Sequence, residues 1–499
     1  MGKIGAQTIK GTIYSYLGVI VGFFSVTLLR SHGLSTEQNG VLELITSYAM
    51  ILVQLGSLGI FMASSRCFPY FRNVDKNHHG FLFLLSSIPI VGTLFFCILY
   101  LIIQSISPEN NYTSFLNEYA IPILILTVAN LIFNIFDTYN RNAFFDAVTG
   151  ATLKEFVLKV TTAIAMGLML FFSMPFSLFL TIWLIANTIP SIIIFYKLKK
   201  EKKLNFSPNL DFLDKEKIQM LSSVSLFAVI TGFTTMIIQY IDKIMIDGMI
   251  NTSLTGIYGI TAIFGTVVIM PSRVMYRIGS IIVAEKWKSN DLAGIASVYK
   301  KSCINQLLIG LLIFIGIWAN IDNVFEMLPK NEGYEAGKYV IFFISLGGLI
   351  EMSTGLNGVI LATSKYYKYD TYFFLALILL TIGANILFIP IYGITGAAIA
   401  SALTTFLFNL FRYLFIWKKF KIQPLSWNNL FILFIGVTIL FVIGLMPSLK
   451  WFIFDIIVRS GLISIIYIGL VYWFKLSPEM NSVIHSSLNK IQDFLNRRT

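Results

Sequence analysis

Residues 372–416 read YFFLALILLTIGANILFIPIYGITGAAIASALTTFLFNLFRYLFI and contain two apolar runs on either side of a short turn. A helix crosses a bilayer with about 20 mainly apolar residues, because its own hydrogen bonds satisfy the backbone where lipid cannot. The runs at 372–389 and 396–416 have this character, and the turn between them contains Pro390 and Gly393. The stretch predicts two transmembrane helices joined by a tight turn.

The same pattern repeats along all 499 residues, of which 56% are hydrophobic and 12% charged. Soluble domains contain roughly 25% charged residues, so a water-soluble fold is disfavoured. The sequence predicts an all-α polytopic membrane protein with about 14 transmembrane helices. The expected spans are 12–29, 41–64, 81–103, 120–138, 157–172, 178–196, 221–240, 254–270, 304–321, 340–361, 372–389, 396–416, 430–446 and 453–474.

A faint internal repeat divides these spans into two lobes. Asn39-Gly40-Val41 and Thr255-Gly256-Ile257 lie 216 residues apart, and Gly167 and Gly383 share this offset. Because each lobe has six spans, the second enters the membrane in the same orientation, which predicts parallel repeats. The expected divisions are an N-terminal six-helix lobe (1–196), a cytoplasmic basic linker (197–219), a C-terminal six-helix lobe (220–417), and two additional helices with a cytoplasmic tail (418–499).

The net charge of +12 is arranged by side of the membrane. If the N-terminus is cytoplasmic, all but six of the 37 Lys and Arg residues fall in cytoplasmic loops or tails. The six exceptions are Arg30, Lys243, Lys330, Lys338, Lys450 and Arg459. This asymmetry predicts a multi-pass protein with both termini in the cytoplasm, and it argues against nucleic acid as a partner.

Several classes of chemistry have no sequence signal. No nucleotide-binding loop of the G-x-x-x-x-G-K-[ST] type occurs, and the three cysteines lack paired spacing. We therefore expect neither an enzyme nor a resident cofactor or metal.

Three groups of segments carry a resemblance to a known family. They are Leu28-Leu29-Arg30-Ser31-His32-Gly33-Leu34 with Leu55-Gly56-Ser57-Leu58-Gly59, Ile241-Asp242-Lys243-Ile244-Met245-Ile246, and Asn385-Ile386-Leu387-Phe388-Ile389-Pro390 leading to Gly396-Ala397-Ala398. The chain resembles the multidrug/oligosaccharidyl-lipid/polysaccharide (MOP) exporter superfamily, and within it the Wzx-like flippases of the O-antigen type. The resemblance implies a central cavity between two lobes and a location in the bacterial inner membrane.

The function implied is translocation of a polyprenyl-diphosphate-linked oligosaccharide by alternating access, driven by a gradient of Na⁺ or H⁺ or by the membrane potential. Membrane lipids, a polysaccharide polymerase and glycosyltransferases are the expected partners. Two alternatives stay open: a cation-coupled extruder of drugs or metabolites, and a non-transporting scaffold for polysaccharide assembly. The apparent spans 13 and 14 favour the flippase over the extruder.

Ionisable groups inside a bilayer need a partner or a watery cavity. One polar stripe follows helical spacing along the fourth span, and further charges lie near span ends. The residues expected to line the cavity are Arg30, Glu43, Arg66, Asn130, Asn134, Asp137, Arg141, Lys243 and Arg273. The competing interpretations are interhelical hydrogen bonding with an Asp137–Arg141 pair for the stripe, and snorkelling to headgroups for the arginines.

Some relatives bind sodium where the seventh span meets the eleventh and twelfth. By this resemblance, Asp242, Thr381, Asn385 and Ser401 are the candidate cation-coupling residues, with helix packing as the alternative. Asp455 and Arg459 are spaced i,i+4 and predict a salt bridge in the last span. Glu351 in the tenth span and Arg412 in the twelfth are candidate partners of each other.

Overall fold

The structure is a computed structural model that describes residues 17–106, 111–209, 211–447 and 449–482, together with Tyr14, His485 and Ser486. Every regular element in this part of the chain is a helix, which confirms the all-α polytopic prediction. Twelve of these helices are long and apolar enough to cross a membrane, and Leu17–Gly33 forms a shorter apolar helix. The predicted eighth span corresponds to α11 (Thr252–Thr266), which has 15 residues.

The chain divides into two compact units, Met1–Ile260 and Thr261–Thr499, which we name unit 1 and unit 2. The boundary falls inside α11. The two units are therefore defined by contacts within the structure, whereas the two predicted lobes are defined by the internal sequence repeat.

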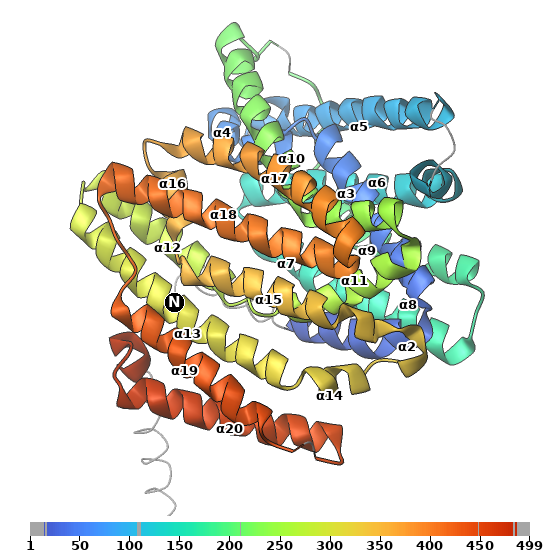
Figure 1. The fold of residues 1–499 in the computed structure, drawn as a ribbon. Helices are drawn as coiled ribbons and strands as arrows, with labels where there is room; N and C mark the ends of the chain where they lie inside the picture. The colour runs from blue at the N-terminus through green and yellow to red at the C-terminus, as the bar shows by residue number, and fades with distance from the viewer. Residues whose placement is uncertain are drawn as a thin grey trace, which may run out of the picture. The chain divides into compact units, whose positions relative to one another are not determined.

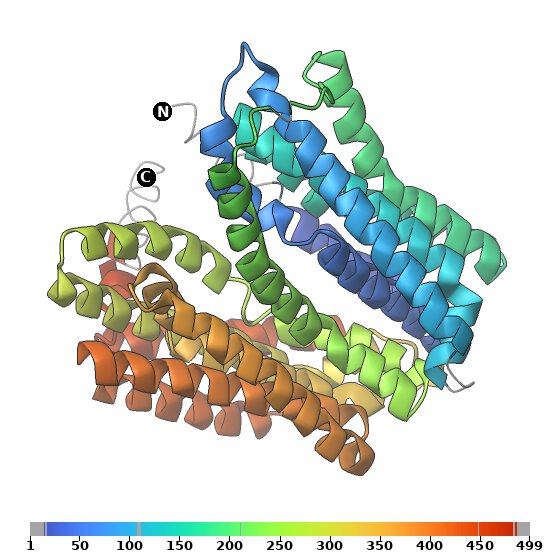
Figure 2. The same cartoon turned by 90° about the horizontal axis from the view of Figure 1, so that it is seen from above.

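Unit 1 contains the first six spans and the seventh (Figure 1). Within it, α3 contacts α5, α6 and α10, while α9 contacts α6 and α8. Figure 2 shows the blue, cyan and green helices of this unit running side by side. Its elements before α11 are η1 (Ser25–Arg30), α2 (Ser31–Gly33), α3 (Thr36–Gly56), α4 (Ile60–Phe71), η2 (Asn77–Gly80), α5 (Phe81–Ile106), α6 (Asn111–Phe144), α7 (Ala147–Thr152), η3 (Leu153–Val157), α8 (Leu158–Phe172), α9 (Phe176–Lys200) and α10 (Lys215–Met249).

Unit 2 contains the later spans, with α18 against α15 and α17, and α13 against α15, α19 and α20 (Figure 1). An apolar cluster around Leu311 and Ile439 joins α13 to α19 and α20, so the last two spans share one core with the rest of the unit. Its elements after α11 are α12 (Ser272–Lys288), α13 (Leu292–Ala319), α14 (Ile321–Glu326), η4 (Lys330–Glu332), η5 (Tyr334–Gly337), α15 (Lys338–Ser353), α16 (Asn357–Thr363), α17 (Tyr367–Tyr392), α18 (Ile394–Phe420), α19 (Trp427–Gly444) and α20 (Phe452–Trp473).

The predicted second span, 41–64, is wrong in its limits because the helix is interrupted. α3 ends at Gly56 and α4 begins at Ile60, with Gly59 at φ +74° between them. The Ser57 hydroxyl donates to the Gln54 carbonyl and accepts from the Gly59 amide, which stabilises the turn. The left-handed conformation favours glycine, which has no Cβ to clash.

The basic segment between the two halves is shorter than predicted. α9 continues to Lys200 and α10 begins at Lys215, where the Asp214 carboxylate accepts from the Lys217 amide at 2.8 Å. An aspartate at this position satisfies an amide that lacks a partner in the first turn. Lysine-rich composition therefore concealed the ends of two helices.

Candidate functional site

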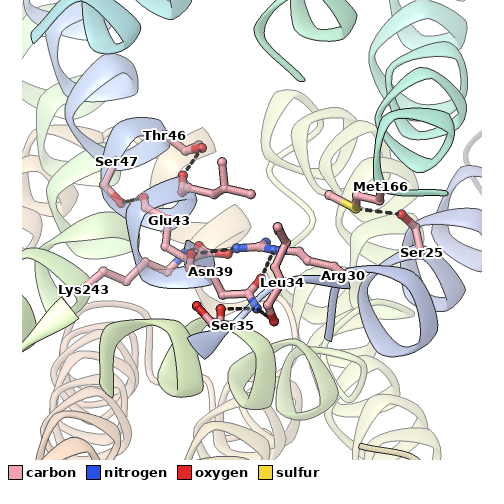
Figure 3. Close-up of polar contacts among 11 residues, drawn as sticks. Ser25, Arg30, Leu34, Ser35, Asn39, Glu43, Thr46, Ser47, Met166 and Lys243 are labelled. Atoms are coloured by element: carbon pink, nitrogen blue, oxygen red, sulfur yellow. Dashed lines mark hydrogen bonds and ion pairs between the residues drawn. The ribbon is translucent and has the colours of Figure 1, made fainter. Parts of the chain in front are cut away.

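A buried carboxylate, Glu43, binds two cations in unit 1 (Figure 3). Its Oε1 lies 2.6 Å from Arg30 Nη1, and its Oε2 lies 2.6 Å from Lys243 Nζ. Glu43 lies in α3, Arg30 ends η1, and Lys243 lies in α10. Arg30 and Glu43 are each 8% exposed, so this ion-pair network forms almost without water.

Asn39 orients the Arg30 guanidinium from one turn before Glu43. Arg30 Nε donates to Asn39 Oδ1 at 2.7 Å, and Arg30 Nη2 donates to the Asn39 carbonyl at 3.0 Å. The amide group of Asn39 in turn donates to the carbonyls of Leu34 and Ser35, which precede α3. All three guanidinium nitrogens thus have acceptors within the protein.

The next helix, α11, approaches α3 closely because two glycines meet there. A methyl group on Gly40 would overlap the backbone oxygen of Thr252, and one on Gly256 would overlap the backbone oxygen of Thr36. These are the glycines that the sequence repeat pairs at an offset of 216 residues. The repeat thus marks the helix crossing that lies beside the ion-pair network.

The carboxylate next to Lys243 has a different partner. Asp242 is 5% exposed and its Oδ2 accepts from the Tyr258 hydroxyl at 2.7 Å. Asp242 and Tyr258 both belong to unit 1. The sequence prediction placed Asp242 in a cation site, and this hydrogen bond gives it a neutral donor.

The polar stripe of α6 meets a cation that sequence reasoning missed. Lys154 Nζ donates to Asn130 Oδ1 at 2.8 Å, and its charge also interacts with Asp137. In the described part of the chain no ion pair within 4.0 Å joins Asp137 and Arg141, although the charge of Arg141 also acts on Asp137. Lys154 lies where a charged cytoplasmic loop meets the predicted fifth span. The sequence pattern therefore did not distinguish it from the loop charges.

Lys154 and Arg30 share an unusual backbone setting. Arg30 ends the π-helical turn η1, and Lys154 lies in the π-helical turn η3. A π turn widens the helix and often occurs at functional sites, because it moves a side chain away from the regular helical face. Helix propensity and hydrophobic periodicity, which are read from the sequence, do not reveal π-helical turns.

The remaining cavity candidates differ in exposure. Arg66 in α4, Arg141 at the end of α6 and Arg273 in α12 are exposed, and none has an ion pair with another described residue. Asn134 in α6 is partly buried. These exposed arginines differ from Arg30, which is buried in its ion pair with Glu43.

The four predicted cation-coupling residues are divided between the units. Asp242 belongs to unit 1, whereas Thr381 and Asn385 in α17 and Ser401 in α18 belong to unit 2. The Thr381 hydroxyl donates to the Leu377 carbonyl of its own helix, and Asn385 is fully buried. The shared cation site stays a prediction.

The predicted pair in the last span is confirmed. Arg459 Nε lies 2.7 Å from Asp455 Oδ2, which also accepts from Asn323 Nδ2 at 2.7 Å. Arg459 Nη2 donates to the carbonyls of Met446 and Pro447, both at 3.0 Å. This pair fastens the loop between α19 and α20 to α14, which is a structural role.

Comparison with solved structures identifies the fold. The chain is similar to a lipid II flippase, MurJ, in an inward closed conformation, with a TM-score of 0.71 and 14% identity over 94% of this chain and 100% of that one. The chain has the fold of the MOP superfamily. No protein-family model and no curated protein sequence matches it.

Multidrug exporters with the MOP fold are also similar, over less of the chain. An inward-facing MATE family transporter of the MOP superfamily gives a TM-score of 0.57 at 10% identity, covering 82% of this chain and 98% of that one. A point mutant of the Vibrio cholerae MATE transporter VcmN gives 0.53 at 14% identity, covering 84% of this chain and 97% of that one. These solved structures share the multi-pass helical fold of this chain.

Proposed function

We propose that this MOP-fold chain is a flippase that moves a polyprenyl-diphosphate-linked oligosaccharide across the bacterial inner membrane by alternating access. The observation that carries the proposal is the likeness to a lipid II flippase along the whole length of that protein. That flippase's name describes a lipid-linked substrate. A lipid-linked substrate also suits the present chain, which has buried polar groups and two spans, α19 and α20, after its two six-span repeats.

Spans α19 and α20 favour a lipid-linked substrate. The similar MATE transporters cover 82–84% of this chain, whereas the lipid II flippase covers 94%. Helices beyond the two six-span repeats are not required for a soluble drug, but they extend the apolar surface against which a polyprenyl tail lies. We assign that role to the exposed faces of α19 and α20.

The cations of the chain supply the second requirement. A lipid diphosphate is anionic and must exchange water for donors of hydrogen bonds when it enters an apolar passage. The exposed guanidinium groups of Arg66 and Arg273 suit this role, with Lys154, Asn134 and Arg141 as additional polar contacts. Arg30 and Lys243 join them only after Glu43 releases its ion pairs.

Transport of a fluorescent lipid-linked oligosaccharide in reconstituted vesicles tests this proposal. The wild-type chain should make the substrate accessible to a quencher or glycosidase on the far side. Arg66→Ala and Arg273→Ala should each reduce the initial rate about tenfold, because one charged hydrogen bond contributes roughly 1.5–3 kcal/mol. Lys301→Ala is the matched control, since Lys301 pairs only with the surface residue Glu479.

The other outcomes identify the alternatives. Movement of a cationic dye, without movement of the lipid-linked sugar, would make the chain an extruder, which its likeness to MATE transporters also allows. No transport of either compound by folded protein would favour the scaffold.

Co-purification with a polysaccharide polymerase or a glycosyltransferase would test the partners. Labelling of single cysteines introduced in the loops would test whether both termini are cytoplasmic.

A further inference from the structure

The tenth span, in unit 2, is broken into two helices. α15 ends at Ser353 and α16 begins at Asn357, with Gly355 at φ +59° between them. A methyl group on Gly355 would overlap Ser302 Oγ and the backbone of Cys303 in α13, so only glycine fits. Discontinuous membrane helices with free backbone groups are typical of places where transporters bind ions.

A break of this kind also occurs in the fourth span, in unit 1. α6 ends at Phe144 and α7 begins at Ala147, with Phe145 at φ +55° between them. A short helix, α7 or α16, therefore follows the break in each half of the chain.

A partly buried carboxylate, Glu351, lies in the last turn of α15 beside the break. Its Oε1 accepts from the Tyr276 hydroxyl of α12 at 2.9 Å, and its Oε2 accepts from Asn409 Nδ2 of α18 at 2.5 Å. Asn409 Oδ1 accepts in turn from Thr354 Oγ1 at 2.9 Å and from Asn357 Nδ2 at 2.8 Å. One hydrogen-bonded chain thus connects Glu351 to both edges of the break.

The charges around the break do not balance. Arg412 of α18 binds Asp370 of α17 through two nitrogens, at 2.8 and 3.1 Å, so these two side chains neutralise each other. Glu351 forms no ion pair with any described residue, and both of its partners are neutral donors. A carboxylate at this depth is costly without a cation or a proton.

Two further buried groups surround the site with unused hydrogen-bonding capacity. The Tyr299 hydroxyl of α13 is buried, within electrostatic reach of Arg412, and has no hydrogen-bond partner among the described residues. Gln306, one helical turn from Ser302 and Cys303 in α13, is fully buried, and both ends of its amide lack partners in the same part of the chain. Unpartnered polar atoms in an apolar interior indicate a state or a ligand that would satisfy them.

We propose that Glu351 binds the coupling proton of this transporter, and that the break between α15 and α16 is the element which its protonation rearranges. This inference rests on the proposed transport function. It assigns the coupling site to Glu351 and not to Asp242, Thr381, Asn385 and Ser401. Arg412 and Asp370 hold the surrounding helices in place while Glu351 changes charge.

The hydrogen-bond pattern selects a proton over sodium. A hard cation requires several oxygen ligands, but the amide of Asn409 presents its NH₂ group to Glu351. A proton requires only that the Asn409 amide turn over, so that its oxygen accepts from the new carboxylic acid. The same rotation removes the acceptor of Asn357 and one of the two acceptors of Thr354, which loosens both edges of the break. Protonation of Glu351 is thereby linked to the angle between α15 and α16.

The other titratable or charged groups that face this region come from four helices. They are Tyr276 from α12, Tyr299 and Cys303 from α13, Asp370 from α17, and Arg412 and Tyr413 from α18. Arg412 and Asp370 bind each other, so Glu351 is the carboxylate of this group that lacks a counter-charge in the described part of the chain.

Infrared spectroscopy of the purified full chain in lipid nanodiscs tests this without substrate. The difference spectrum between about pH 5 and 8 should contain the C=O band of one buried carboxylic acid. Glu351→Gln should remove that band, whereas Glu326→Gln, at an exposed carboxylate, should leave it in place. Tyr276→Phe removes one hydrogen bond to the Glu351 carboxylate but not the carboxyl group itself, so it should keep the band.

The outcomes separate this inference from the proposed function. A band that persists in folded Glu351→Gln would overturn the assignment of the proton to Glu351. A band that shifts on adding NaCl at constant pH, but not on adding KCl, would replace the proton with sodium. Loss of the band in Glu351→Gln would support the proton site even if the chain failed to move a lipid-linked sugar, and that failure would overturn only the proposed substrate.

Discussion

Lys243 Nζ lies 2.6 Å from Glu43 Oε2, although 200 residues separate the two in the chain. Glu43 also binds Arg30, so a single carboxylate joins the first, second and seventh spans. Because these charges are nearly excluded from water, the strength of the network depends on all three being present. A conformational change that separates α3 from α10 must first break the Lys243–Glu43 bond.

Glu43→Gln should lower the stability of the chain by about 3 kcal/mol, because it leaves two cations without a counter-charge. Thermal unfolding of the purified protein in detergent would measure this loss. Adding Lys243→Met to Glu43→Gln should recover part of it, since one of the unpaired cations is then removed. Strictly additive losses in the double variant would show that the Lys243–Glu43 contact contributes nothing.

Gly256→Ala should destabilise the protein by about 1–3 kcal/mol, because the new methyl group meets the backbone oxygen of Thr36. Gly383→Ala is a matched control, since nothing lies within 4 Å of its added carbon. Alanine is the better helix former, so the control should gain up to about 1 kcal/mol. Equal unfolding temperatures for the two variants would argue against the close crossing of α3 and α11.

Lys154→Met should reduce transport roughly tenfold, because it removes the charged hydrogen bond to Asn130 and the cation that faces Asp137. Lys154→Arg retains the charge and should retain more of the rate. Initial rates in vesicles, normalised to the amount of folded protein, measure the effect. Wild-type rates in Lys154→Met would place Lys154 in a purely structural role.

Asp146 lies between two spans, and its carboxylate accepts from the Thr149 amide and hydroxyl and binds Lys197 at 2.6 Å. Partial burial raises the pKa of Asp146, but these hydrogen bonds outweigh burial and hold it well below its usual value. Because the pKa of Asp146 is lower in the folded chain, its contribution to folding stability is complete at pH values above its pKa in the unfolded chain, about 3.9. That contribution is lost as the pH falls through its pKa in the folded chain.

Asp146→Asn should therefore reduce stability by roughly 2 kcal/mol at every pH from about 5 to 8, with no pH dependence in that range. The difference from wild type should shrink only below about pH 4. Asp75→Asn, an exposed residue for which no partner is described, should have no effect at any pH. Unfolding temperatures measured across this range would test both variants, and a difference that disappears near pH 6 would contradict the assignment.

The sequence by itself determined the class of fold and the places where charge enters the membrane. Long apolar runs specify helices because lipid offers the backbone no hydrogen bonds, and this reasoning gave the helical architecture and the Asp455–Arg459 pair. The repeat of Gly40 and Gly256 was also readable from the residues alone. These are local properties, each decided within a few helical turns.

Only the tertiary structure decided which buried charges are partners. Glu43 binds Arg30 and Lys243, Asp137 lies near Lys154 as well as Arg141, and Glu351 has neutral donors while Arg412 binds Asp370. Helical periodicity predicts on which face of its helix a side chain lies, but not which other helix packs against that face. The π turns and the break at Gly355 also change the face itself, because they interrupt the regular helical spacing. The partner of a buried ion depends on packing between distant segments, which composition and spacing do not encode.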